Sequence, residues 1–239
     1  MSPRFSTIEE GIEAIAAGRV VIVLDSESRE NEGDFIASAE LVTPQLINFM
    51  VREGRGQLCV PVLPEVATRL DLTLMAATSD ESAPKFTIPI DHHSCGTGIS
   101  PLARSISIQF MLSPESKAED FVRPGHIFPL IARPGGVLQR TGHTEAAVDL
   151  ARLAGLTPAG VLCEICSRDG RHMATRGELM AMATEFRIPI VTVDALVDYR
   201  RREATVTPTA CVPPHERARP LQPSGHVPRG TDTLPQVVP

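Results

Sequence analysis

The chain has 239 residues and a mass of 25.8 kDa, enough for one large domain with a buried core or for two small domains. Hydrophobic residues make up 42% and charged residues 22% of the sequence, which is typical of a globular protein and excludes fibrous and fully disordered chains. The formal net charge of −6 argues against a protein that coats nucleic acid, because such binding needs many cationic contacts to phosphate. An anionic ligand would therefore need a local basic pocket.

The beginning of the chain has no export signal, because Glu9 and Glu10 follow a short polar stretch where an apolar segment would be required. The longest aliphatic runs, such as residues 20–24, are far shorter than the roughly 20 residues that span a bilayer. Five cysteines, an odd number, favour reduced thiols. We expect a cytoplasmic protein with no membrane segment and no structural disulfide.

Helices and strands are predicted to alternate along most of the chain. Ser6 and Glu9 have the spacing of a capping box before apolar residues at helical spacing, which predicts an opening helix. The following elements are expected as strands at 20–24, 57–62, 86–90, 160–166 and 188–193, a second apolar stretch at 35–41, and helices between Thr43 and Gly54 and at 144–154, 177–186 and 194–202. This order predicts an α+β fold with α/β-like alternation, in which helices cover one mixed sheet.

From residue 204 onward the sequence is rich in proline and threonine and has no apolar periodicity. Such a segment cannot bury enough apolar surface to offset the entropy lost on ordering. We expect one domain over residues 1–203 and a disordered, Pro-rich tail over residues 204–239.

A strongly acidic loop is predicted at residues 25–34, where five acids and Arg29 give a net charge of −4. Clustered carboxylates repel one another unless a cation or a proton joins them, and their oxygens are the ligands that Mg²⁺ and Mn²⁺ prefer. The alternative is a solvated acidic hairpin. The acids are Asp25, Glu27, Glu30, Glu32 and Asp34.

A basic stretch follows in the second half of the chain, with three arginines and no acid between residues 123 and 140. Its motifs are Arg123-Pro-Gly-His126, Arg133-Pro-Gly-Gly136 and Arg140-Thr-Gly-His143-Thr144. Glycine lets a backbone approach a ligand closely, arginine matches phosphate oxygens, and the start of a helix at Thr144 offers free amides. These features predict a phosphate pocket, although turns with incidental histidines remain the alternative.

The segment Cys163-Glu-Ile-Cys166 has the spacing of a zinc or redox motif, but it reads as a strand and no second pair of cysteines accompanies it. Glu164 would then stand among apolar neighbours, where burial raises the pKa of a carboxyl group and suits it to acid–base work. A structural pair of thiols and a purely structural strand are the alternatives. Adjacent His92 and His93 are expected at the surface, because neighbouring side chains on a strand diverge.

Several of these motifs, in this order, resemble those of the 3,4-dihydroxy-2-butanone 4-phosphate synthase family of riboflavin biosynthesis, over about residues 5–203. The motifs are Arg29-Glu-Asn-Glu-Gly-Asp34, Arg123-Pro-Gly-His-Ile-Phe-Pro-Leu130, Arg133-Pro-Gly-Gly-Val137, Gly142-His-Thr-Glu-Ala-Ala146 and Cys163-Glu-Ile165. The resemblance implies conversion of D-ribulose 5-phosphate into 3,4-dihydroxy-2-butanone 4-phosphate and formate, through enediol formation, dehydration and skeletal rearrangement with Mg²⁺ or Mn²⁺. It also implies an α+β fold and a homodimer with active sites at the subunit interface.

The resemblance assigns roles to individual residues. Glu30 and His143 would be the metal ligands. Glu164 and His126 would be the acid–base residues, with Glu32 as a further catalytic partner. The substrate would be held by Arg29, Glu30, Asp34, Arg140, Thr141, Gly142, His143, Thr144 and Glu164, with Arg140 and Thr144 nearest the phosphate.

The chain departs from the family pattern at two places. Ala103 stands where the family usually has an aspartate, next to the unusual Pro101, and the turn at residues 166–172 differs in sequence and length. A catalytically degenerate homologue that binds a sugar phosphate or a protein partner is therefore the alternative function, and a thiol or zinc protein is a third. Many family members continue into a GTP cyclohydrolase II domain with a cysteine-rich zinc site, an activity not expected from a tail with Cys211 alone.

Overall fold

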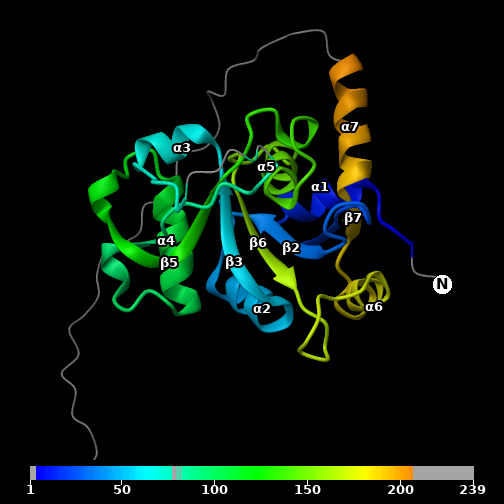
Figure 1. Ribbon diagram of the computed structural model, residues 1–239, viewed down its shortest axis with the longest axis horizontal. Helices are drawn as coiled ribbons and strands as arrows, with labels where there is room; N and C mark the ends of the chain where they lie inside the picture. Colours follow the sequence, from blue (N-terminus) through cyan, green and yellow to red (C-terminus); the bar gives the residue numbers. More distant parts are fainter. Residues whose placement is uncertain (1–3, 77–79, 81, 207–239) are drawn as a thin grey trace, which may run out of the picture. The chain divides into compact units, whose positions relative to one another are not determined.

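A seven-stranded mixed sheet forms the centre of the fold, with strand order β4-β5-β3-β6-β2-β1-β7 (Figure 1). The computed structural model describes residues 4–76, 80 and 82–206. The pairs β1–β7 and β3–β5 are parallel and the other four are antiparallel, so the predicted mixed sheet is confirmed. The strands are β1 Val21–Leu24, β2 Gly33–Ser38, β3 Arg55–Val62, β4 Ile90–His92, β5 Phe121–Ile131, β6 Gly160–Ile165 and β7 Ile190–Thr192.

Helices cover both faces of the sheet, because its central strands bury side chains on both sides. In β1, Ile22 and Leu24 belong to a core shared with α2, α4 and α6, whereas Val21 and Val23 belong to a core shared with α1, α5 and α7 (Figure 1). The helices are α1 Ile8–Ala16, α2 Pro44–Gly54, α3 Pro64–Arg69, α4 Pro101–Leu112, α5 His143–Leu153, α6 Arg176–Phe186 and α7 Val193–Val206. The predicted helical cover of the sheet is therefore confirmed.

The predicted capping box of the first helix lies one residue further along the chain. Thr7 accepts the Glu10 N–H at 3.2 Å, and the Glu10 carboxylate accepts the Thr7 N–H at 2.8 Å. The Ser6 hydroxyl accepts the N–H of Ile190 at 3.3 Å, so it is engaged with the strand at the edge of the sheet. The second helix begins as predicted, with Thr43 as its N-cap.

The region between residues 63 and 131 differs most from the prediction. The strand expected at 86–90 is wrong: Phe86 and Thr87 make only isolated bridges, and regular pairing starts at Ile90. The helices α3 and α4 and the strand β5 were not predicted, and in β5 two prolines, Pro124 and Pro129, interrupt the hydrophobic pattern. In α4, Pro101 occupies the first turn after the N-cap Ser100, where its missing N–H costs nothing.

The last helix continues beyond its expected end at residue 202. Because α7 runs to Val206, residues 204–206 are helical and do not belong to the predicted tail. The remainder of that tail, residues 207–239, lies outside the described residues. Within the described part of the chain, none of the helices combines the length and the apolar character needed to cross a bilayer.

Candidate active site

A cavity of about 290 Å³ lies where the loop between β1 and β2 meets the start of α5 and the end of β6. It gathers most of the side chains that the sequence singled out, from segments more than 100 residues apart. Its lining residues are Arg29, Glu30, Glu32, Asp34, Cys59, Pro84, Phe86, Leu130, Arg140, His143, Thr144, Leu162 and Glu164. The acidic loop and the Arg140–Thr144 segment thus face one space, whereas Thr141, Gly142 and His126 are not among its lining residues.

The acidic loop folds around the buried carboxylate of Asp25. One of its oxygens accepts the Glu30 N–H at 3.1 Å and the Arg29 guanidinium at 2.8 Å, and the other accepts the Glu32 N–H at 2.9 Å. Asn31 adopts a left-handed conformation with φ of 55°, which turns the chain back toward β2. Asp25 therefore shapes the loop so that Glu30 and Glu32 face the cavity.

His143 presents one ring nitrogen to the acidic loop. Its Nε2 lies 3.1 Å from the Val23 carbonyl oxygen, which can only accept, so the proton is on Nε2 and the lone pair is on Nδ1. Burial lowers the pKa of His143, so the ring is neutral at pH 7, as a metal ligand must be. A histidine whose other nitrogen donates to a backbone carbonyl has the usual arrangement of a metal ligand.

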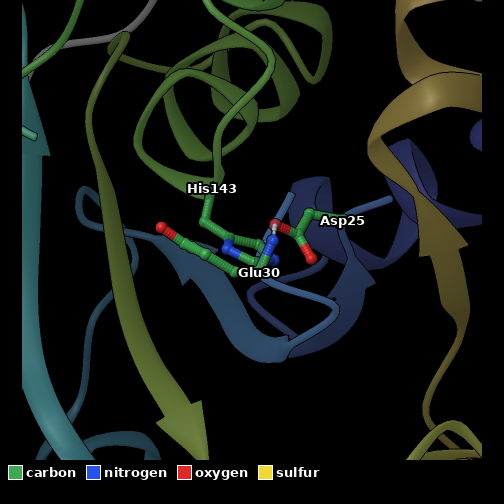
Figure 2. Close-up of side chains that lie close together, drawn as sticks. All are labelled: Asp25, Glu30 and His143. Atoms are coloured by element: carbon green, nitrogen blue, oxygen red, sulfur yellow. Dashed lines mark hydrogen bonds between the residues drawn. The ribbon is translucent and has the colours of Figure 1, made fainter. Parts of the chain in front are cut away.

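Asp25, Glu30 and His143 form the only group of three or more potential metal ligands among the described residues (Figure 2). Each supplies a ligand atom, and these atoms lie within 4.8 Å of one another. Two carboxylates and a neutral imidazole suit a divalent cation. Both Asp25 oxygens already accept hydrogen bonds inside the loop, whereas Glu30 accepts the Arg29 guanidinium at 2.6 Å through one oxygen, Oε2, alone.

Asp34 and Glu164 add two further carboxyl groups to the cavity. Burial, reinforced by the charge of Glu164, raises the pKa of Asp34 well above its usual value. Asp34 Oδ1 is buried without a hydrogen-bond partner among the described residues, and Oδ2 lies 3.8 Å from His143 Nδ1. Burial and the nearby Glu30 raise the pKa of Glu32 as well. The cavity thus has more acidic than basic side chains in its lining, and a bound cation would reduce the repulsion among the carboxylates.

Glu164 is half-buried rather than fully buried, although its neighbours in β6 are buried as predicted. Its carboxylate accepts the N–H of Gln57 at 2.7 Å, which fixes one oxygen of a side chain that lines the cavity. Position 56 must be glycine, because a Cβ there would overlap the Glu164 backbone and carboxylate. The side chain is therefore held in place by the adjacent strand β3.

Arg140 forms the cationic end of the cavity. Its Nη1 donates to the buried carboxylate of Glu145 at 2.6 Å, and its Nε donates to the Ser82 carbonyl at 2.7 Å. The Arg140 side chain is only 9% exposed. Gly142 leaves space for it, because a Cβ there would overlap Arg140 Nη1. Thr144 follows at the second residue of α5, so the helix N-terminus and Arg140 together favour an anion.

The other two arginines of the predicted phosphate pocket do not reach it. Arg123 donates to the main-chain carbonyls of Ala118, Phe121 and Leu70, at 3.0, 3.2 and 2.6 Å. Arg133 is buried and is not among the lining residues of the cavity. Within one copy of the chain, the cationic end of this cavity is therefore formed by Arg140 and not by Arg123 or Arg133.

Two histidines lie at the β4–β5 edge of the sheet. His92 is buried and its ring stacks on Phe110 at 3.8 Å, so the prediction that it lies at the surface is wrong, whereas His93 is exposed as expected. His126 on β5 bonds to the buried Asp91 at 2.6 Å. Sequence reasoning missed Asp91 and Glu145, which hold His126 and Arg140, and it named Asp25 only as one acid of the loop and not as the group around which the loop folds.

The cysteines give no support to a zinc or redox site. Cys59, Cys95, Cys163 and Cys166, the four within the described residues, are all free, as expected. Burial raises the pKa of Cys163 to about 12, so it is an unreactive thiol at pH 7. No group of metal ligands found among the described residues includes a cysteine.

Comparison with known proteins points to one family. The family model of 3,4-dihydroxy-2-butanone 4-phosphate synthase matches residues 9–199. A riboflavin biosynthesis protein RibBA from Bacillus mycoides is 54% identical over 203 residues, which cover 84% of this chain and 51% of that protein. The chain therefore spans about half the length of the curated relatives it matches.

Two solved structures resemble the fold closely. RibBX, a two-domain 3,4-dihydroxy-2-butanone 4-phosphate synthase from A. baumannii, is 44% identical with a TM-score of 0.78, over 82% of this chain and 58% of that chain. A 3,4-dihydroxy-2-butanone 4-phosphate synthase in complex with two magnesium ions is 37% identical with a TM-score of 0.78, over 84% of this chain and 99% of that chain.

Proposed function

The chain belongs to the 3,4-dihydroxy-2-butanone 4-phosphate synthase family, and we propose that it converts D-ribulose 5-phosphate into 3,4-dihydroxy-2-butanone 4-phosphate and formate. The observation that carries this proposal is the single cavity that joins an acidic, histidine-containing end to an arginine and a helix N-terminus. A sugar phosphate has the matching chemistry, with hydroxyl and carbonyl oxygens at one end and a dianion at the other.

The phosphate is assigned to the end formed by Arg140 and the start of α5. Arg140 already uses two of its donor groups on Glu145 and Ser82, which fix its orientation and leave the remaining N–H groups for the ligand. Thr144, which lines the cavity at the start of α5, completes this end, and Thr141 and Gly142 are assigned to it only by the resemblance. Such remote binding holds the reacting carbons in place against the acidic end.

Glu30 and His143 are proposed to hold Mg²⁺ or Mn²⁺. The donor set fits this cation: an exposed carboxylate and a neutral imidazole nitrogen lie close together, beside a buried carboxylate oxygen of Asp34 that has no partner among the described residues. When bound, the cation would polarise the carbonyl and hydroxyl oxygens of the substrate and so favour loss of the adjacent proton.

Proton transfer is assigned to carboxyl groups on the sheet. Glu164, held by the Gln57 N–H, is the proposed base that removes a carbon-bound proton in enediol formation. Glu32, whose pKa is raised by burial and by Glu30, is the proposed donor of a proton during dehydration. Arg29 and Asp34 would orient the hydroxyl groups between them.

We infer a homodimer in which His126 of one copy completes the site of the other. His126 stands four residues from the lining residue Leu130, roughly 13 Å along the strand, so it does not serve the cavity of its own chain. Its corner of the molecule, formed by β4, β5 and α4, carries several exposed large apolar side chains, as expected of an interaction surface. They are Ile99, Leu102, Phe110 and Val122, which are 54, 58, 42 and 51% exposed.

The proposal is tested by incubating the purified protein with ribulose 5-phosphate and Mg²⁺. Formate should be released without inorganic phosphate, EDTA should stop the reaction, and added Mg²⁺ should restore it. The matched variant Cys166→Ser should retain activity, because no proposed step uses that thiol. Thermal stabilisation by the sugar phosphate without formate release would instead identify a degenerate homologue that only binds.

We also propose that the protein is located in the cytoplasm. The four described cysteines are free thiols, which suits the reducing cytoplasm in which the substrate would be met.

A further inference from the structure

The segment that carries His126 bulges out of the sheet. Between β4 and β5 the pairing runs Ile90 with Ile127 and then Asp91 with Val122, so residues 123–126 have no partners in the ladder. A bulge of this kind redirects a side chain that would otherwise follow the pleat of the strand. His126 is the last residue of this bulge, and its side chain contacts Asp91.

Three contacts hold the bulge in one conformation. The Arg123 guanidinium binds the carbonyls of Ala118 and Leu70 on either side, at 3.0 and 2.6 Å. The Gly125 N–H donates to the Pro89 carbonyl at 2.8 Å. A Cβ at position 125 would overlap the Ile90 backbone, so only glycine allows this approach. The Arg-Pro-Gly-His motif is thus a support for its histidine.

Asp91 binds His126 through both carboxylate oxygens. Oδ1 accepts the backbone N–H of His126 at 3.0 Å, and Oδ2 lies 2.6 Å from its Nδ1. The Asp91 side chain is 7% exposed and that of His126 is 43% exposed. Because a carboxylate only accepts, the ring proton is on Nδ1 and the lone pair on Nε2 is directed away from Asp91.

The backbone at Gly98 covers this pair. Gly98 has φ of +80°, and a Cβ there would overlap Asp91 Oδ2 and approach His126 Nδ1 to 2.7 Å. The guanidinium of Arg104 on α4 lies within electrostatic reach of the Asp91 carboxylate. The Nδ1 side of the imidazole is thereby enclosed while its other edge stays exposed.

We propose that Asp91 is a positioning residue for His126, fixing the tautomer and the direction of the ring so that Nε2 can transfer a proton in the substrate cavity of the partner copy. This inference rests on the proposed function, in which His126 is an acid–base residue. The inference does not depend on residue 103, which is Ala103 in this chain and usually an aspartate in the family. The Asp91–His126 pair is complete without that carboxylate.

Asp91→Asn tests the proposal, because the asparagine amide has the same shape as the carboxylate. It presents to His126 Nδ1 either its oxygen, which is a weaker acceptor than a carboxylate, or its NH₂ group, which is a donor. We expect kcat for formate release to fall about 100-fold, within the range for general acid–base catalysis, with KM changed less than about threefold. The matched control Asp120→Asn alters a carboxylate of the same corner that bonds the Lys117 N–H and not His126, and should keep the wild-type kcat. A wild-type kcat in Asp91→Asn would overturn the proposal.

Nitrogen NMR of the ¹⁵N-labelled imidazole reports the tautomer directly and needs no turnover. In the wild type the His126 ring should carry its proton on Nδ1; in Asp91→Asn it should shift toward the Nε2-protonated form, while Asp120→Asn leaves it unchanged. An unchanged tautomer in Asp91→Asn, or a wild-type ring protonated on Nε2, would contradict positioning by Asp91. If the wild type released no formate, the synthase proposal alone would fail, since the tautomer experiment stands without it.

Discussion

Asp34 on β2 and Glu164 on β6 lie directly opposite each other in an antiparallel pair. Two acids in this position destabilise a sheet, and here the burial of Asp34 adds to the cost. Burial, and next the charge of Glu164, raises the pKa of Asp34 well above its usual value. A buried Asp34 and a half-buried Glu164 beside a histidine with a free nitrogen form the arrangement expected where a cation binds.

Glu164→Gln should stop turnover and preserve binding. The amide oxygen can still accept the Gln57 N–H, so the strand stays intact while the proton acceptor is lost. We expect kcat to fall by about 10²- to 10⁴-fold. Thermal stabilisation by ribulose 5-phosphate should persist in the variant. A kcat within tenfold of the wild type would remove Glu164 from its role.

Arg140→Lys should weaken substrate binding more than turnover. Lysine keeps a positive charge opposite the buried Glu145 but loses the fork that also reaches the Ser82 carbonyl. We expect KM to rise about tenfold, corresponding to about 1.4 kcal/mol. Arg140→Ala is a poorer test, because leaving Glu145 buried without its partner costs about 3–5 kcal/mol of stability.

The control for this variant is Arg168→Lys, an exposed arginine paired with Glu185 away from the cavity. Its KM should equal that of the wild type. An Arg140→Lys variant with unchanged KM and reduced kcat would show that this arginine acts on the reaction and not on the phosphate.

The sequence was most informative about side chains that face the cavity directly. The acidic loop, Arg140 and His143 were predicted from their residue types, and the structure places them around one cavity. Arg123, from the same basic stretch, binds main-chain carbonyls instead, because a guanidinium donates to a carbonyl oxygen as readily as to a phosphate and sequence does not reveal which lies nearby. The supporting acids Asp25 and Asp91 depend on contacts across a loop and a bulge, which no short-range pattern encodes.

The shared active site predicts complementation between two inactive variants. His126→Ala lacks the residue given to the partner, and Glu164→Gln lacks a residue of its own cavity. In a mixed dimer one of the two sites regains both groups, so a randomised mixture should recover about a quarter of the wild-type activity. Unfolding and refolding the two variants together, with each refolded alone as the control, provides the measurement. No recovery would mean that His126 does not act across an interface.

Glu178→Gln should destabilise the protein in a pH-dependent way. Glu178 accepts the Ser167 hydroxyl at 2.7 Å and the Thr175 N–H at 2.8 Å, and so joins the start of α6 to the turn at residues 166–172, where the sequence departs from the family. These hydrogen bonds, the one from Ser167 first, lower the pKa of Glu178 from 4.5 to about 2. The folded state therefore favours the ionised form.

A lowered carboxyl pKa stabilises the fold above the unfolded value of 4.5 and loses this contribution as the pH falls toward about 2. The Tm of Glu178→Gln should lie below that of the wild type at pH 7, and the difference should shrink between pH 4.5 and 2, because the wild-type carboxylate then becomes neutral as well. The control Glu119→Gln changes an acid that is 79% exposed and should leave Tm unaltered at every pH. A Tm difference that stays constant from pH 7 to pH 2 would show that the substitution acts through packing and not through the charge-dependent hydrogen bonds.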